Sequence, residues 1–515
     1  MIKNCKYNIL TTLFLGTVLQ LPAFSAAEDL DILDLPITTI QKHFESGKLT
    51  SRSLVESYLK RIAAYDQKGP KLNSISTIND NALNRADELD RERKTQGPRS
   101  PLHGIPILVK DNYGTADMQT AAGSSVFEGW IPAHDSTIVK RLREAGAIIL
   151  GKTTMHEFAM GYANHGSLFG QTLNPYALDR IPGGSSGGTG AAVAANFATA
   201  GFGSDTCGSI RMPSSHNALV GLRSSVGLSS RHGIIPLAHS WDTGGPMTHN
   251  VTDLAIIYDV IAGYDAADPQ TANSAGHIPG SYTSNLRRDG LSGQRLGLLT
   301  NLLLVDEKDK EVASIIRRAV EDIKKAGAKV VDINVPGLME LMQDDTGGFY
   351  PILLELRPDM NAYLKANPGI GVESVAGIIN SESLKDDEIR GFFQLAIKAE
   401  PGETFEYLAI QAKRQRIRQA VVVAMAEAGV DALVYPTIRQ KPAKIGETQS
   451  GTNCHLSGNI DFPAISVPAG FTDDGLPVGI EFMARKWQEA YLLRLAYAYE
   501  QASLHRRMPA STPAL

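Results

Sequence analysis

The stretch Asp135-Ser-Thr-Ile-Val-Lys-Arg-Leu-Arg-Glu-Ala-Gly146-Ala-Ile-Ile-Leu150 contains the pattern that decides the fold class of this chain. Its first two residues can cap a helix, Ile138 and Leu142 fall on one helical face, and Gly146 can end the helix. The apolar residues 148–150 then predict a buried strand. A helix that leads through a glycine into a buried strand is typical of α/β proteins.

The same pattern recurs in the second half of the chain. Residues 312–323 have helical spacing of apolar side chains, Gly327 can end that helix, and residues 330–331 begin a strand. A long helix over residues 410–425 leads in the same way into a strand at 432–435. Helices that alternate with short apolar strands predict an α/β fold with a largely covered sheet.

The chain contains no internal repeat and no linker that would divide its 515 residues. We therefore expect one large α/β domain with a central sheet covered by helices. Periodicity is weak between about residues 335 and 405, which predicts a helical insertion over the sheet. Insertions of this kind often shape a substrate pocket.

Composition and charge restrict the partners of the chain. The formal net charge is −5, and no Lys- or Arg-rich block is present that could form a basic patch. Nucleic acids and anionic membranes are recognised through such patches. We expect neither as a partner, and we expect no cofactor and no metal.

The N-terminus has the order of a secretory signal peptide. Lys3 and Lys6 precede a mainly apolar run, Ile9–Leu21, and small residues follow it just before Glu28. The run is short for a membrane span, although an uncleaved anchor is the alternative. We expect residues 1–27 to be removed and a periplasmic or secreted domain of residues 28–515 that does not stay on a membrane.

Three short motifs match well-known sites but lack the required context. Gly146–Thr153 fits the formula of a phosphate-binding loop, yet its middle residues are expected to be a strand. Gly183–Gly187 fits the nucleophile elbow of α/β-hydrolases, but the preceding residues 174–182 contain two prolines and do not predict a strand. His156 lacks the second histidine that a zinc site of this type requires, so we expect a polar loop or surface residue.

Three other segments carry residue types suited to amide or ester chemistry. Lys110 ends the apolar run Ile105–Val109, and its ammonium would either reach water or, if buried, become a possible base. Ser185 lies in a glycine-rich loop that runs into an alanine-rich helix, where it could also be a helix cap. Ser209 ends a turn of small residues, whose N–H groups could stabilise an oxyanion. An ordinary turn serine is the alternative, and no histidine is arranged with Ser209 as in a Ser-His-Asp triad.

These segments resemble the hallmark motifs of the amidase signature family. The resemblance is carried by Gly104-Ile-Pro-Ile-Leu-Val-Lys110-Asp111, Gly183-Gly-Ser-Ser-Gly-Gly188 and Asp205-Thr-Cys-Gly-Ser-Ile-Arg211. It covers roughly residues 40–505. Further similar stretches are Gly221–Arg231, Ser240–Pro246, Asp461–Pro468 and Gly475–Gly479. The resemblance implies the family fold, in which a mixed sheet is covered by helices, and the hydrolysis of carboxamides.

The resemblance also implies a role for each site residue. Lys110 would be a neutral base, Ser185 would follow a cis peptide bond and relay the proton, and Ser209 would attack the amide carbon to form an acyl-enzyme. The oxyanion hole would consist of the backbone N–H groups of Thr206, Cys207, Gly208 and Ser209.

Cys207 departs from the family motif, where a glycine is common. The hole uses backbone atoms and can survive this change. A packed, inert thiol is the simplest interpretation of Cys207, and a disulfide with Cys454 is the alternative.

The substrate is less specified than the chemistry. Residues 354–364 and 487–500 are similar to the peptide-amidase-like branch, whose members release ammonia from C-terminal amides. The expected partner is thus a small-molecule or peptide amide. The alternatives are an esterase and a non-catalytic binding protein with the same fold.

Overall fold

The computed structural model describes residues 31–343, 350–399 and 404–515. The segment expected to be a signal peptide, residues 1–27, lies outside the described residues. Residues Ile32–Leu515 form one compact unit. None of the described helices combines the length and the apolar character needed to cross a bilayer.

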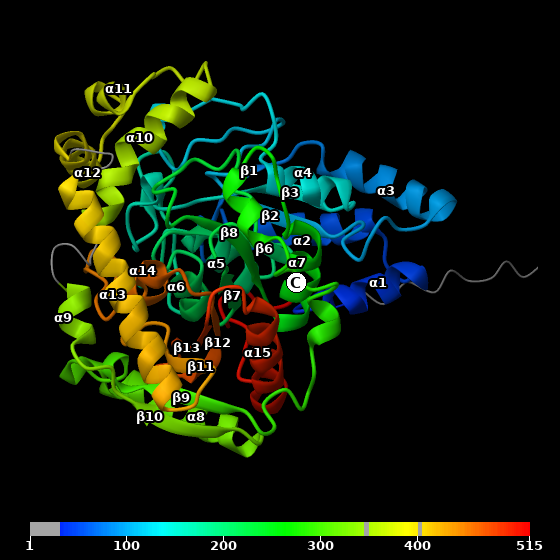
Figure 1. Ribbon diagram of the computed structural model, residues 1–515. Coiled ribbons are helices and arrows are strands. Elements are labelled where there is room, and N and C mark those ends of the chain that lie inside the picture. Colours follow the sequence, from blue (N-terminus) through cyan, green and yellow to red (C-terminus); the bar gives the residue numbers. More distant parts are fainter. Residues whose placement is uncertain (1–30, 344–349, 400–403) are drawn as a thin grey trace, which may run out of the picture. The chain divides into compact units, whose positions relative to one another are not determined.

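An 11-stranded mixed sheet forms the centre of the domain (Figure 1). The order of its strands is β1-β3-β2-β6-β8-β7-β12-β13-β11-β9-β10. Their bounds are Ile75–Ile78 (β1), Pro106–Lys110 (β2), Ile148–Thr153 (β3), Ala200–Asp205 (β6), Val220–Arg223 (β7), Thr243–Thr248 (β8), Arg295–Leu299 (β9), Lys329–Ile333 (β10), Ala432–Pro436 (β11), Ala464–Phe471 (β12) and Pro477–Ala484 (β13). The expected single domain with a mixed sheet is confirmed. A separate small hairpin consists of β4 (His165–Gly166) and β5 (Gly170–Gln171).

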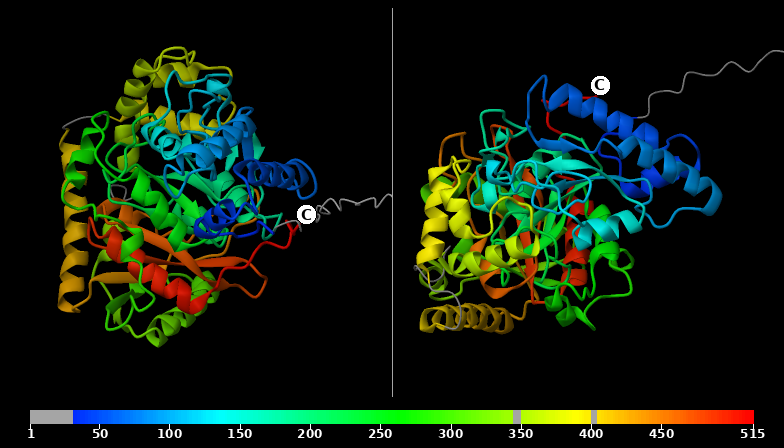
Figure 2. Two further views of the ribbon diagram at one scale, coloured as in Figure 1. Left: turned by 90° about the vertical axis from the view of Figure 1, so that its right-hand side faces the viewer. Right: turned by 90° about the horizontal axis from the view of Figure 1, so that it is seen from above.

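Helices cover the sheet, as the further views in Figure 2 show. For example, α8 and α15 pack against each other and against β12 and β13. The bounds of the helices are Ile37–Glu45 (α1), Ser51–Tyr65 (α2), Ala82–Gln96 (α3), Thr137–Glu144 (α4), Gly187–Ala194 (α5), Arg211–His216 (α6), Val251–Ile261 (α7), Lys310–Lys325 (α8), Leu338–Gln343 (α9), Tyr350–Ala366 (α10), Val375–Asn380 (α11), Asp387–Lys398 (α12), Phe405–Glu427 (α13), His455–Ile460 (α14) and Glu489–Ser503 (α15).

The helix-then-strand units expected from the sequence are present. The stretch 135–150 forms α4, which begins after Ser136, and β3; residues 312–331 lie in α8 and β10. The phosphate-loop formula indeed falls on β3, where Lys152 is fully buried. A loop that is part of a buried strand has no free N–H groups with which to wrap a phosphate.

The expected helical insertion consists, in its described part, of α9 to α12. Helices α10, α11 and α12 contact one another and lie together at one end of the domain (Figure 1). Their apolar side chains share a core cluster with Phe158 and Trp241, which lie close in sequence to the loops of the candidate site. The insertion therefore packs beside the site, as expected.

The order of the strands brings the candidate residues together. Strands β2 and β6 are parallel neighbours, with Val109 opposite Phe202. Lys110 is the last residue of β2, and Asp205 is the last residue of β6. Because parallel strands end at the same edge of a sheet, the lysine and the turn after Asp205 meet there.

Candidate active site

Lys110 lies inside the protein, with its ammonium group fully buried. Its Nζ donates hydrogen bonds to Ser185 Oγ at 2.7 Å and to Ser204 Oγ at 2.9 Å. Burial lowers the pKa of Lys110 to about 7, although Asp205 and Asp242 act in the opposite direction. The interpretation of Lys110 as a strand-end lysine in water is therefore wrong, and a large share of this amine is uncharged near neutral pH.

The glycine-rich loop holds Ser185 against this amine. The Gly184–Ser185 peptide bond is cis, and the Ser185 side chain is fully buried. A Cβ on Gly184 would lie 2.8 Å from the carbonyl oxygen of Gly161, so only glycine fits there. Ser186 precedes α5 but makes no side-chain cap; its N–H instead donates to the carbonyl of Ser209 at 3.3 Å. This bond joins the loop to the turn of the expected nucleophile.

Two arginines hold the turn that follows β6 through Asp205. The Asp205 carboxylate accepts hydrogen bonds from the N–H of Ile210 at 3.1 Å, from Arg211 Nε at 3.2 Å and from Arg223 Nη1 at 3.1 Å. Burial would raise the pKa of Asp205, but Arg211 and Arg223 outweigh burial and hold it below its usual range. A buried carboxylate with two guanidinium partners fixes the turn on both sides.

The backbone of the turn exposes N–H groups to one point. Among the described residues, the N–H groups of 206–209 donate no hydrogen bond to another protein group. Ser209 is 6% exposed, and a Cβ on Gly208 would lie 2.6 Å from the Cβ of Cys454. Unpaired amides beside a partly exposed serine are what an oxyanion hole requires.

Asp242 supports the turn from the side of β8. Its carboxylate accepts a hydrogen bond from Thr206 Oγ1 at 2.5 Å and from the N–H groups of Leu237 and Ala238. Burial raises the pKa of Asp242. The sequence showed this residue only as part of a similar stretch, and its contact with the turn could not be read from it.

Cys207 forms a disulfide with Cys454, which precedes α14. The interpretation of Cys207 as a packed free thiol is therefore wrong, and the alternative is confirmed. The bridge joins residues separated by 247 positions, so it ties the turn after β6 to the C-terminal part of the domain. His455 Nδ1 lies 3.4 Å from Cys207 Sγ.

Ser209 faces a cavity of about 790 Å³. Thr206 and Cys207 also line the cavity, while Lys110 and Ser185 are buried behind them and do not. Residues that the sequence did not indicate complete the wall, among them His156, Tyr162 and His455. They come from segments far apart in the chain, and no local motif marks them.

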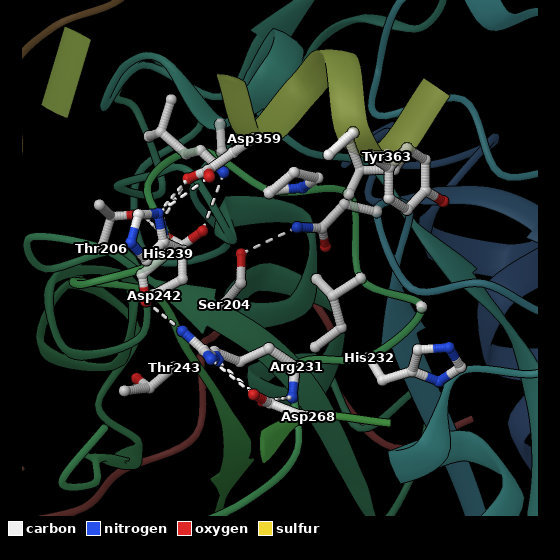
Figure 3. A pocket seen from close by; sticks show the side chains of 18 of the residues that line it. Ser204, Thr206, Arg231, His232, His239, Asp242, Thr243, Asp268, Asp359 and Tyr363 are labelled. Carbon is white, nitrogen blue, oxygen red and sulfur yellow. Dashed lines mark hydrogen bonds and ion pairs between the residues drawn. The ribbon is translucent and has the colours of Figure 1, made fainter. Parts of the chain in front are cut away.

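Ser204 lines a second cavity, of about 270 Å³ (Figure 3). Its Oγ, which accepts from Lys110, also accepts from Asn112 Nδ2 at 3.0 Å. On the same wall, Arg231 donates to Asp268 through both Nε and Nη2. Ser204 therefore fixes the lysine from the side opposite Ser185.

Two groups of side chains bring three potential metal ligands within 4.8 Å of one another. The first is Cys207, Cys454 and His455, whose sulfur atoms are bonded to each other and are not thiolates. The second is His239, Glu355 and Asp359, at the wall of the second cavity. Both carboxylates already accept hydrogen bonds, Glu355 from Ser240 and Tyr407, and Asp359 from His239. We therefore assign no metal to either group.

The sequence profile of the family described as Amidase matches residues 53–493. The chain belongs to the amidase family. It is a hydrolase that acts on amides, and the site geometry above belongs to this class of enzyme.

Several relatives have nearly the same extent as this amidase. One subunit of the glutamyl-tRNA(Gln) amidotransferase of Geobacter metallireducens is 34% identical over 493 residues, which cover 92% of this chain and 98% of the relative. The native peptide amidase of Stenotrophomonas maltophilia is 36% identical with a TM-score of 0.87, and the match covers 93% of this chain and 99% of that one. An amidase family protein of Bacillus anthracis is 33% identical with a TM-score of 0.82, covering 93% and 92%.

Proposed function

We propose that this enzyme cleaves carboxamides through an acyl-enzyme on Ser209, with Ser185 and Lys110 as the proton relay. The observation that carries the proposal is the 2.7 Å contact of Lys110 Nζ with Ser185 Oγ. The amine in that contact has a pKa lowered by burial to about 7, so a neutral base is available near neutral pH.

In the first half of the reaction, Lys110 takes the proton of Ser185 as Ser185 takes that of Ser209. Ser209 Oγ bonds to the amide carbon, and the carbonyl electron pair moves onto oxygen. The N–H groups of 206–209 stabilise this charge. When the carbonyl re-forms, the C–N bond breaks and the relay returns the proton to the departing nitrogen.

In the second half, water attacks the ester carbon of the acyl-enzyme. Its proton passes through Ser185 to Lys110, the bond to Ser209 Oγ breaks, and the proton returns to Ser209. The products are a carboxylic acid and ammonia or an amine.

For the substrate, we propose C-terminal amides of peptides. Two observations support this choice. The TM-score is 0.87, with 36% identity, to the Stenotrophomonas maltophilia peptide amidase, but 0.74, with 27% identity, to the amidotransferase subunit of Thermotoga maritima that acts with glutamyl-tRNA(Gln) in its name. The cavity at Ser209 is also large enough, at about 790 Å³, for several residues of a peptide.

We further propose that the enzyme is exported after removal of residues 1–27 and acts in the periplasm or outside the cell as a domain of residues 28–515. The charge and apolar pattern of the N-terminus supports this location. The Cys207–Cys454 disulfide is consistent with it, because disulfides persist in oxidising compartments. N-terminal sequencing of the protein from a periplasmic extract tests the proposal, and a start at Met1 contradicts it.

Ammonia release from a peptide amide tests the reaction. We expect Ser209→Ala to abolish turnover and Lys110→Ala and Ser185→Ala each to lower kcat by at least about a hundredfold, since the relay acts as a unit. Thr300→Ala, on the far side of the sheet order, serves as a control for the effects of mutation. Undiminished turnover in Ser209→Ala contradicts the mechanism. Turnover of esters but not of amides favours the esterase, and binding without turnover favours the non-catalytic protein.

A further inference from the structure

The cavity at Ser209 has an uneven distribution of charge. Three of its lining residues are acidic, Asp386, Glu388 and Glu447, and none is a lysine or an arginine. Two of its histidines add no positive charge near neutral pH, because burial lowers the pKa of both His156 and His455 to about 4. The wall that a substrate meets is therefore negative.

The carboxylates are free to act on a substrate. Glu388 and Glu447 are exposed and Asp386 is half-buried, whereas Ser209 is almost covered. The carboxylates thus lie toward the mouth of the cavity and the nucleophile toward its floor. In the part of the chain that the structure describes, none of the three is within 4 Å of a lysine or arginine; Asp386 has only His165 Nδ1, at 4.0 Å.

The acidic side chains come from two separate segments. Asp386 caps α12 through one carboxylate oxygen, which accepts from the N–H groups of Glu388 and Ile389. Its other oxygen takes no part in that cap. Glu447 lies on the loop between β11 and α14. A substrate that reaches from Ser209 to the mouth passes acidic groups of both the helical insertion and this loop.

We propose that the cavity selects amides that carry a positive charge at a distance from the scissile carboxamide, such as the C-terminal amides of peptides with lysine or arginine side chains. The inference rests on the proposed peptide-amide hydrolysis and specifies its substrate class. The same field disfavours peptides with extra carboxylates. One carboxylate about 8 Å from a ligand charge changes affinity about twofold in water, so three together give roughly a tenfold preference.

Matched peptides provide the test. The peptides are N-acetyl-Xaa-Ala-Phe-amides in which Xaa is lysine, glutamine or glutamate, and the readout is kcat/KM for ammonia release by the full-length enzyme. We expect lysine to exceed glutamine and glutamine to exceed glutamate, with a lysine-to-glutamate ratio of roughly ten or more. The ratio should decrease in 0.5 M salt, because exposed charges are screened.

Variants assign the preference to these residues. Glu447→Gln and Glu388→Gln remove exposed charges, and Asp386→Asn keeps an oxygen that can cap α12. We expect the lysine-to-glutamate ratio to decrease in each variant and to approach one in the triple variant. Glu382→Gln, an exposed change in the same segment that does not line the cavity, should leave the ratio unchanged.

The outcomes separate this inference from the proposed function. Equal kcat/KM for the three peptides, or a preference that survives in the triple variant, overturns the charge selection while leaving amide hydrolysis intact. A lack of ammonia from all three peptides contradicts peptide-amide hydrolysis itself, and the charge selection with it.

Discussion

At the scale of single residues, the burial of Lys110 has a direct consequence for the dependence on pH. The base must be neutral, and its pKa is lowered to about 7. We therefore expect kcat/KM to fall tenfold per unit as pH decreases below about 7 and to be level above it. His156 and His455, with a pKa of about 4, do not titrate in that range.

A pH profile with an uncharged amide substrate checks this prediction. Lys110→Arg, whose side chain stays charged, should be inactive at every pH. A profile of the wild-type enzyme that is level from pH 5 to 8 would show that the base is not this lysine.

Gly208 provides a second prediction at this scale. An added Cβ would lie 2.6 Å from the Cβ of Cys454, so the turn must move. We expect Gly208→Ala to lower kcat by about a hundredfold through a displaced oxyanion hole, a loss typical of one missing donor. Gly280→Ala, with no atom near the added Cβ, is the matched control. Wild-type kcat in Gly208→Ala would contradict this assignment of the turn.

The residues that perform the chemistry could be predicted from sequence because they lie in three continuous motifs. Their surroundings could not. Whether Lys110 is buried depends on Ser185 and Ser204, which are 75 and 94 positions away. The choice between a thiol and a disulfide at Cys207 likewise depends on where residue 454 lies in space.

At the scale of elements, the Cys207–Cys454 bridge ties the turn after β6 to the start of α14. We expect Cys454→Ala to lower kcat, because the turn is then free to move, and to lower the unfolding temperature by about 3 °C, since a bridge typically stabilises by roughly 2–4 kcal/mol. Activity and differential scanning fluorimetry measure the two effects.

Reduction of the wild-type enzyme with dithiothreitol should reproduce both effects of Cys454→Ala. The same treatment of the variant should change nothing further, which provides the control. A reduced enzyme with unchanged kcat and unfolding temperature would show that the bridge does not support the turn.

Elements were predicted best where apolar residues follow a simple period. Helices α8 and α13 and strands β3, β10 and β11 are examples. Strands β12 and β13 were not, because they contain Pro468 and Gly479, which usually interrupt strands. In the structure, Pro468 adjoins a shift in register, and a Cβ on Gly479 would lie 2.7 Å from the Oγ atoms of Ser215 and Ser466. Tertiary packing thus requires residues that local propensity disfavours.

At the scale of the whole domain, its two ends are joined. Arg506, near the C-terminus, donates from Nε and Nη2 to the carboxylate of Asp34, at 2.9 and 2.6 Å. We expect Asp34→Asn to lower the stability by about 1.5–3 kcal/mol, because a charged hydrogen-bonded partner is lost, while kcat stays unchanged. Urea unfolding measures this change. Asp306→Asn, at a helix start elsewhere, is the control, and equal losses in both variants would contradict a special role for the clamp.

The order of the strands was beyond prediction for a related reason. The sequence indicates which strands exist, but neighbours such as β7 and β12 are separated by more than 200 residues. Their pairing depends on the energy of the assembled sheet and not on any local pattern. The mixed character of the sheet was expected only because the chain resembles a known family.

The position of Lys110 also determines which reagents can reach the site. An uncharged amine at neutral pH is a reactive nucleophile, and on the surface it would be modified by electrophiles such as isocyanates or activated esters. Here the fully buried amine lies behind Ser185, and only Ser209 borders the cavity. An electrophile that enters the cavity therefore meets the serine first. The fold protects its base from covalent damage while leaving the nucleophile open to inhibitors.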